Sequence, residues 1–245
     1  MVNTEQGAID LTQSEIVDMW PVAATFLDKM DLSTSLGFGY SKATDITDFD
    51  LSIDFEHRSE ERLSEASLRS NITLQQEGND QSRQDLRFSQ KYLRHNRRFR
   101  NWSLGAESND ALGVNLRLSG GSAIGKYFAK TNDRVFYLSG GLLATQEFAE
   151  GGAEEANLEA QATARYRFFR YASPKRSFDT TVSIFPSLTD VGRVRFDLRS
   201  TFKLEFYTDL FWSMEFYATG DNEPLSGNEA EKFDYGIMTA LGWSY

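Results

Sequence analysis

The sequence predicts an all-β fold, a transmembrane antiparallel up-and-down β-barrel of about twelve strands that follows a short N-terminal segment. Three observations predict it. From Asp31 to the last residue, apolar and polar side chains alternate with a period of two. The alternating segments run for about ten residues or more, against about 5–6 in the strands of globular proteins. Their apolar faces end in aromatic side chains, as expected where a strand crosses the two interfaces of a bilayer.

The composition taken alone would suit a soluble acidic protein. The chain has 245 residues, a net charge of −10 and a mean hydropathy of −0.48. No stretch approaches the ~20 consecutive apolar residues that a membrane-spanning helix requires. A barrel needs no such stretch, because each strand turns alternate residues toward lipid and toward a polar interior. The chain has no cysteine, which excludes disulfides and thiolate metal sites.

Residues 1–30 differ from the rest and predict a small pre-barrel segment on the periplasmic side. Ala8–Leu11 favours a short strand, and Thr12–Glu15 matches a helix capping box. After Pro21, residues 22–30 favour a short amphipathic helix. The first residues lack the basic and apolar regions of an export signal. Since an outer-membrane protein must be exported, we expect this chain to be a mature or trimmed form.

The alternation is clearest between Arg193 and Tyr207. One face carries Val194, Phe196 and Leu198, and the other carries Arg195, Asp197 and Arg199. A soluble β-sandwich also alternates, but the long segments and the aromatic ends argue against it. The same phase predicts a row of charged side chains that line the lumen: Asp50, Asp54, Glu56, Arg69, Asp85, Arg87, Lys91, Glu159, Arg165, Arg167, Arg195, Asp197, Arg199, Lys203 and Glu205.

Twelve segments follow one another between residues 31 and 245, the predicted barrel. They span residues 31–41, 46–57, 63–75, 82–93, 98–108, 111–129, 134–148, 155–171, 176–188, 192–206, 209–220 and 232–245. An even number is typical of single-chain bacterial barrels, whose two termini are periplasmic. Gly120-Gly121 and Gly140-Gly141 interrupt the period. They predict bulges, bends or sites covered by a neighbouring aromatic side chain.

The connections between segments alternate in length and charge, which predicts an orientation. The tight connections near residues 58–62, 94–97, 130–134, 172–176 and 207–209 are mostly basic, whereas those at 76–83, 148–155 and 219–232 are longer and acidic. Short turns are periplasmic and long loops are extracellular in such barrels. Basic turns would also lie favourably beside anionic lipid headgroups. We expect these charges to be solvated or to anchor the interface rather than to form a specific binding site.

The final strand places Tyr235, Leu241, Trp243 and Tyr245 on one face. A last strand that ends on an aromatic residue resembles the C-terminal signal by which bacterial barrels are recognised for assembly. We therefore expect outer-membrane lipids and the barrel-assembly machinery as partners, no nucleic acid, and a monomer in the outer membrane.

Several local motifs carry a family resemblance. They are Leu36–Ala43, Phe168–Tyr171, Phe185–Asp190 with Gly192–Arg195, and Asp234–Ile237 leading to Leu241–Tyr245. Over roughly residues 8–245 the chain resembles the YdiY-like, salt-induced outer-membrane protein family, a domain of unknown function. The resemblance implies export and an outer-membrane barrel. It implies no known activity and supplies no catalytic residues.

Catalytic and metal chemistry find little support in the residues. A hydroxyl nucleophile needs a base, most often histidine, and the chain has only His57 and His95, without a recognisable set of partners. A lipid-modifying enzyme is therefore a remote alternative, and we expect no catalytic residues and no cofactor. Asp48, Asp50, Asp54 and Glu56 form an acidic row that could hold a hard cation. We favour a row that faces inward arginines and lysines, and expect no metal.

Two function classes remain open for a barrel of this kind. In the first, the barrel is a narrow pore for ions or small solutes, and its acidic mouth favours cations. In the second, ion pairs close the lumen, and the barrel is a structural or surface-interaction protein. Buried charges are tolerable only when they are paired or hydrated, and both classes meet that condition.

Overall fold

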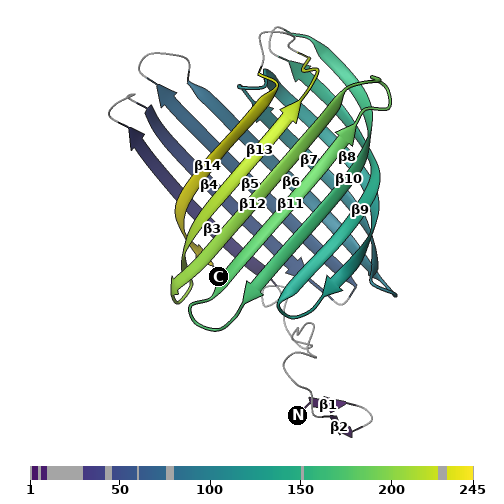
Figure 1. The fold of residues 1–245 in the computed structure, drawn as a ribbon, viewed down its shortest axis with the longest axis vertical. Helices are drawn as coiled ribbons and strands as arrows, with labels where there is room; N and C mark the ends of the chain where they lie inside the picture. The colour runs from purple at the N-terminus through teal and green to yellow at the C-terminus, as the bar shows by residue number, and fades with distance from the viewer. Residues whose placement is uncertain are drawn as a thin grey trace.

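A computed structural model describes residues 2–4, 7–9, 30–41, 46–59, 61–75, 80–149, 152–225 and 231–244. Within these ranges twelve antiparallel strands close into a barrel in which chain neighbours are also spatial neighbours (Figure 1). The predicted fold class is confirmed. The strands are β3 (Met30–Ser41), β4 (Ile46–Arg58), β5 (Arg62–Gln75), β6 (Gln81–Arg94), β7 (Arg98–Asn109), β8 (Val114–Lys130), β9 (Arg134–Ala149), β10 (Glu154–Arg170), β11 (Arg176–Pro186), β12 (Val194–Tyr207), β13 (Leu210–Asp221) and β14 (Phe233–Ser244).

The predicted strand limits lie within two residues of these bounds except at the start of β8, expected at residue 111 and found at Val114. The reason is a tight turn. The Gly113 amide donates to the Asp110 carbonyl at 3.0 Å, and Gly113 has a φ of 65°, which glycine adopts without steric cost. The chain therefore completes this turn before the strand begins.

The N-terminal segment contains two short strands, β1 (Val2–Thr4) and β2 (Gly7–Ile9), which pair with each other. The strand expected at Ala8–Leu11 thus overlaps β2. The expected capping box and amphipathic helix fall on residues outside the described ranges, apart from Met30, which begins β3. The structure gives no helix among its described residues that is long and apolar enough to cross a membrane.

The outward face of the barrel is apolar and open to its surroundings. Leu36, Trp102, Ile124 and Ile237 each expose more than 60% of their surface. Contiguous apolar area of this kind is rare on soluble monomers, whereas a membrane barrel carries an outward apolar band. The phase of the alternation therefore assigns this face to lipid.

Glycines allow close contact between neighbouring strands at two places in the barrel. A Cβ atom added at Gly141 would lie 2.0 Å from the Ser122 carbonyl oxygen, and one at Gly121 would lie 2.6 Å from that of Leu142. Such crowding between neighbouring strands leaves room only for hydrogen. At the junction of β3 and β14, a Cβ on Gly37 would lie 2.8 Å from the Thr239 carbonyl oxygen.

The bulges expected at Gly120-Gly121 and Gly140-Gly141 are not found, so that alternative was wrong. The register between β8 and β9 runs through all four glycines without a shift. Shifts occur instead between Val114 and Leu116 and between Tyr127 and Ala129. At Gly121 and Gly141 the atom nearest to an added Cβ is a backbone carbonyl oxygen of the neighbouring strand, not an aromatic ring.

The two ends of the barrel differ in their connections. We call the end with the connections at 59–61, 95–97, 131–133, 171–175 and 208–209 the turn end, and the opposite end, with 42–45, 76–80, 110–113, 150–153, 187–193 and 222–232, the loop end. β3 starts and β14 finishes at the turn end. The loop end carries the two longest connections, 187–193 and 222–232, but the connection at 150–153, predicted to be long, is shorter than the turn at 171–175. The alternation of short and longer connections predicted from the sequence is therefore present only in part.

Candidate functional site

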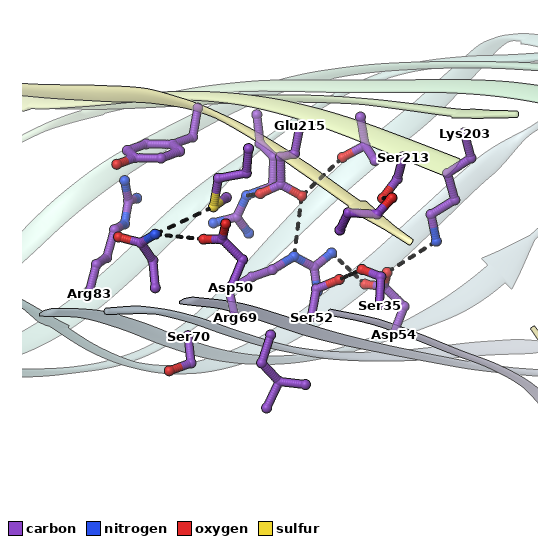
Figure 2. Close-up of a pocket in the computed structure, with 17 residues that line it drawn as sticks. Ser35, Asp50, Ser52, Asp54, Arg69, Ser70, Arg83, Lys203, Ser213 and Glu215 are labelled. Carbon is purple, nitrogen blue, oxygen red and sulfur yellow. Dashed lines mark hydrogen bonds and ion pairs between the residues drawn. The ribbon is translucent and has the colours of Figure 1, made fainter. Parts of the chain in front are cut away.

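Ion pairs join opposite walls at the middle of the lumen. Arg69 of β5 contacts Asp54 of β4 at 2.6 Å and Glu215 of β13 at 3.3 Å. Arg199 of β12 contacts Glu215 at 3.1 Å and Asp85 of β6 at 3.3 Å. Because β5 and β6 are not neighbours of β12 and β13, these contacts must cross the interior. Figure 2 shows Arg69 and Glu215 reaching toward each other across this space.

The middle layer continues through Arg87 of β6. Its guanidinium contacts Asp85 on the same strand at 2.9 Å and also Asp197 of β12. Asp85 is almost fully buried and accepts from both Arg87 and Arg199. Since a buried carboxylate is tolerable when paired and hydrogen bonded, each acid in this layer is held beside a guanidinium.

A second layer crosses the lumen nearer the turn end. Arg165 of β10 contacts Glu65 of β5 at 2.8 Å and Asp179 of β11 at 2.7 Å. Arg167 contacts Glu56 of β4 at 3.3 Å. Lys203 of β12 contacts Asp54 at 3.4 Å and donates to the Ser33 hydroxyl at 3.0 Å. This layer therefore ties β4 and β5 to β10, β11 and β12.

Aromatic side chains fill the β7–β9 side of the turn end. Phe99, Tyr127 and Tyr137 are buried, and their ring centroids lie 5.0–5.5 Å apart. The Lys91 ammonium lies 5.0 Å from the centre of the Tyr137 ring, a cation–π contact. A Cβ at Gly125 would lie 2.2 Å from the Phe99 ring, so glycine makes room for this aromatic cluster.

A third layer lies at the loop end. Arg193, which is 2% exposed, contacts Asp221 at 2.7 Å and Glu147 at 2.9 Å. Arg117 of β8 contacts the same two carboxylates. Arg195 and Glu159 form a two-bond pair at 2.7 and 2.6 Å.

Two strands on opposite sides of the barrel also meet at this end. Asp234 of β14 accepts from Asn109 of β7 at 3.1 Å and pairs with Arg83 of β6 at 3.3 Å. The Glu231 amide donates to the Ala111 carbonyl at 3.0 Å. Because β14 and β7 lie far apart in the strand order, these contacts span the mouth of the barrel.

The charged residues predicted to line the lumen are mostly brought together in these layers. Lys91 of β6 pairs with Glu65 on the neighbouring strand β5, and Asp50 and Glu205 lie outside the layers. Asp50 accepts from Asn71 on the adjacent strand at 2.6 Å. Glu205 pairs with Lys175 of the β10–β11 turn at 2.9 Å. This hydrogen bond and the charge of Glu205 raise the pKa of the Lys175 ammonium.

Several members of the layers were not singled out from the sequence. They are Glu65, Arg83, Arg117, Glu147, Asp179, Arg193, Glu215, Asp221 and Asp234. Glu215 and Asp221 follow the same period of two as the predicted residues. Applying the same alternation to every residue of β13 would have predicted that Glu215 and Asp221 face the lumen.

The acidic row on β4 divides into two halves. Asp54 and Glu56 are in ion pairs, as favoured from the sequence. Asp48 and Asp50 instead accept from Thr73 and Asn71, both at 2.6 Å, and within the described ranges no ion pair reaches either one. The described residues include no group of three or more acidic, histidine or cysteine side chains arranged to hold a metal ion.

A small cavity lies beside Asp50. It has a volume of about 40 Å³, room for a few water molecules at roughly 10–15 Å³ each. Its lining comes from both sides of the β3/β14 junction and includes Ser35, Asp50, Asn71, Glu215, Tyr217 and Met238 (Figure 2). Small residues on β3 and β14, such as Ser35 and Ala240, leave this space.

The residues with other predicted roles lie apart from the lumen layers. His57 is on β4, opposite Met30 and Ser64 in the register, and His95 is in the β6–β7 turn. Tyr235, Leu241 and Trp243, predicted as part of the assembly signal, are exposed on the outer face of β14. Tyr245 lies outside the described residues.

Comparison with known protein families identifies the chain's relatives. The family model described as "Protein of unknown function, DUF481" matches residues 34–245. The chain belongs to the DUF481 family. This match covers almost the whole barrel, and the function of the family is unknown. The narrower resemblance to YdiY-like proteins stays a prediction. A search of curated proteins finds no match for this DUF481 chain.

Solved structures with a similar fold are barrels of the outer membrane. The NanC porin superposes with a TM-score of 0.50 at 9% identity, covering 88% of this chain and 98% of that one. A bacterial polysaccharide outer membrane secretin gives a TM-score of 0.43 at 8% identity, covering 88% and 97%. The translocator domain of the autotransporter NalP from Neisseria meningitidis gives 0.43 at 13%, covering 88% and 86%. The porin likeness shows the fold alone, which is that of an outer-membrane β-barrel.

Proposed function

We propose that this DUF481 protein is a narrow, cation-leaning pore whose path follows the wall made by β3, β4, β13 and β14. The observation that carries the proposal is the cavity in this wall, whose lining includes small side chains, the acids Asp50, Asp54 and Glu215, and the cations Arg69, Arg83, Arg199 and Lys203. Each of these cations is paired with an acid, whereas Asp50 has no described cation partner. The opposite wall is filled at the turn end by Phe99, Tyr127 and Tyr137. Among the described residues, the cavity leaves room for a water-filled path on the β3/β14 side.

The charge of this wall supports a preference for cations. Asp48 and Asp50 accept hydrogen bonds from neutral groups, and no described cation pairs with them. Uncompensated carboxylates in a narrow, low-dielectric space attract cations and repel anions. The Arg69–Glu215 pair crosses the same path, so ions pass only when these side chains move, and the conductance should be small.

Single-channel recording in planar bilayers tests the pore. We expect small conductance steps and a reversal potential in a KCl gradient that indicates cation preference. Asp50→Asn should lower that preference, because it removes a charge from the cavity and leaves every described ion pair intact. Asp133→Asn, the same change at an exposed turn, serves as the control and should leave the reversal potential unchanged. Equal reversal potentials for the Asp50→Asn variant and the unchanged protein would contradict a path along this wall.

The orientation also belongs to this proposal. Short turns are periplasmic in outer-membrane barrels, so both ends of the barrel domain would be periplasmic and the loop end would face outward. The chain has no native cysteine. Val191→Cys, at an exposed loop-end position, should react with an impermeant thiol reagent on intact cells. Asp133→Cys at the turn end should react only after the outer membrane is broken. The reverse pattern would overturn the orientation.

A closed, non-conducting barrel is the second candidate function. The ion pairs that cross the lumen in three layers and the Glu231–Ala111 bond across the mouth favour it. Such a barrel would act as a structural or surface-interaction protein, with lipids as its surroundings and the assembly machinery as a partner of β14 during biogenesis. Absence of steps above the bare bilayer would select this candidate over the pore.

A further inference from the structure

The strands β3 and β14 close the barrel along only part of their length. Ser33–Leu36 pair with Leu241–Ser244 at the turn end. β3 nevertheless continues to Ser41 beside β4, and β14 begins at Phe233 beside β13. Between the described residues 37–41 and 233–240 there is no ladder. Figure 1 shows the two strands diverging toward the loop end.

The point at which the strands separate can be located. At Gly37 they are still close, since an added Cβ would lie 2.8 Å from the Thr239 carbonyl oxygen. At Gly39, two residues further, the nearest atoms are those of the Asp48 side chain on β4, at 3.5 Å. β14 has therefore moved away from β3 between these two levels.

An open strand edge is costly in the hydrocarbon of a bilayer. An unsatisfied backbone amide or carbonyl there costs several kcal/mol, which is why membrane barrels close completely. The edges beyond Gly37 and Thr239 must therefore meet water or the polar part of a ligand. The lumen cavity lies directly behind this opening, with Ser35 of β3 and Met238 and Ala240 of β14 among its lining residues.

We propose that the opening between β3 and β14 is a lateral portal from the membrane to the lumen cavity, and that it binds a single-chain amphiphile with a cationic head group. The outer rim matches the chain of such a ligand. Leu36, Phe38, Tyr235 and Ile237 flank the opening, and each is more than 60% exposed.

The inner wall matches the head group. Asp50 lines the cavity and Asp48 lies beside the gap at Gly39. Both carboxylates are hydrogen bonded to neutral partners rather than to described cations. Arg69, Arg83, Arg199 and Lys203 also line the cavity, but each is already paired with an acid. A cationic head reaching through the portal would gain an ion pair with Asp48 or Asp50, whereas an anionic head would meet two carboxylates that have no described cation partner. The portal serves this ligand whether or not the lumen conducts.

Fluorescence quenching in lipid vesicles tests the portal. The reporter is bimane on Met238→Cys at the inner side of the portal. The control is bimane on Ser139→Cys, which is in phase with buried Tyr137 and lies on β9, a strand paired on both edges. The probes are a nitroxide-labelled alkylammonium ion and the matching nitroxide-labelled alkyl sulfate. We expect the alkylammonium probe to quench position 238 several-fold more than position 139, and more than the sulfate does.

A second reporter position keeps the test valid if the Met238→Cys variant fails to fold. Gly39→Cys lies on the facing edge, where an added Cβ meets only Asp48 at ordinary contact distance, and it should be quenched like position 238. Folding of each variant is checked by its heat-dependent migration on a gel. Equal quenching at the portal and at position 139 would overturn the portal. Sulfate quenching as strong as that by alkylammonium, or an alkylammonium preference that survives Asp48→Asn with Asp50→Asn, would overturn the cationic head group.

Discussion

A single buried acid shows how charge is accommodated in this lumen. Glu159 is 1% exposed, and both of its carboxylate oxygens accept from Arg195, at 2.7 and 2.6 Å. Two parallel charge-assisted bonds are the strongest arrangement that these side chains form. Removal of one partner is costly because the remaining charge keeps its desolvation penalty and loses its compensation.

Arg195→Ala should therefore lower the free energy of unfolding by about 3 kcal/mol or more. Arg134→Ala breaks a pair of the same chemistry with Asp133, but that pair is exposed at a turn, and it should cost less than about 1 kcal/mol. Guanidinium chloride unfolding of both variants in lipid vesicles measures the difference. Equal losses of unfolding free energy in the two variants would mean that water in the lumen screens the charge of Glu159 to the same degree that bulk water screens Asp133.

At the scale of the strands, alternation was enough to predict the elements but not their partners across the lumen. Each strand faces lipid on one side, so its period appears in the sequence whatever lies opposite. The contact between Arg69 and Glu215 joins residues 146 positions apart. It depends on how closely the walls approach across the lumen. That distance leaves no periodic pattern in the sequence, so the ion pairs between the walls could not be predicted.

Two adjacent glycines on β9 test whether the close contact between β8 and β9 requires glycine. A Cβ at Gly141 would lie 2.0 Å from the Ser122 carbonyl oxygen, whereas one at Gly140 has its nearest contact at 3.6 Å. Gly141→Ala should thus destabilise the barrel by about 1–3 kcal/mol through overpacking. Gly140→Ala should change stability by less than about 1 kcal/mol, in either direction. Comparable losses in denaturant unfolding for both variants would show that strand conformation, not the contact with the neighbouring strand, requires glycine here.

In the molecule as a whole, the two halves of the lumen differ in how they are filled. The half at β7–β9 is packed with aromatic rings at the turn end. The half at β3–β5 and β12–β14 keeps a cavity that the Arg69–Glu215 pair crosses. Whether the barrel conducts therefore depends on a few long side chains rather than on the diameter of the sheet, since mixed-sign charges can fill a barrel of this size.

Arg69→Ala should open this half. It removes the side chain that links β5 to both Asp54 and Glu215, so the single-channel conductance should rise. The two acids left without this partner should move the reversal potential further toward that of the cation.

Arg165→Ala is the matched control, because Arg165 also crosses the lumen between acids but does not line the cavity. The conductance of this variant should stay near that of the unchanged protein. An equal rise in both variants would place the path elsewhere, and an absence of current in both would mean that the remaining ion pairs suffice to close the barrel.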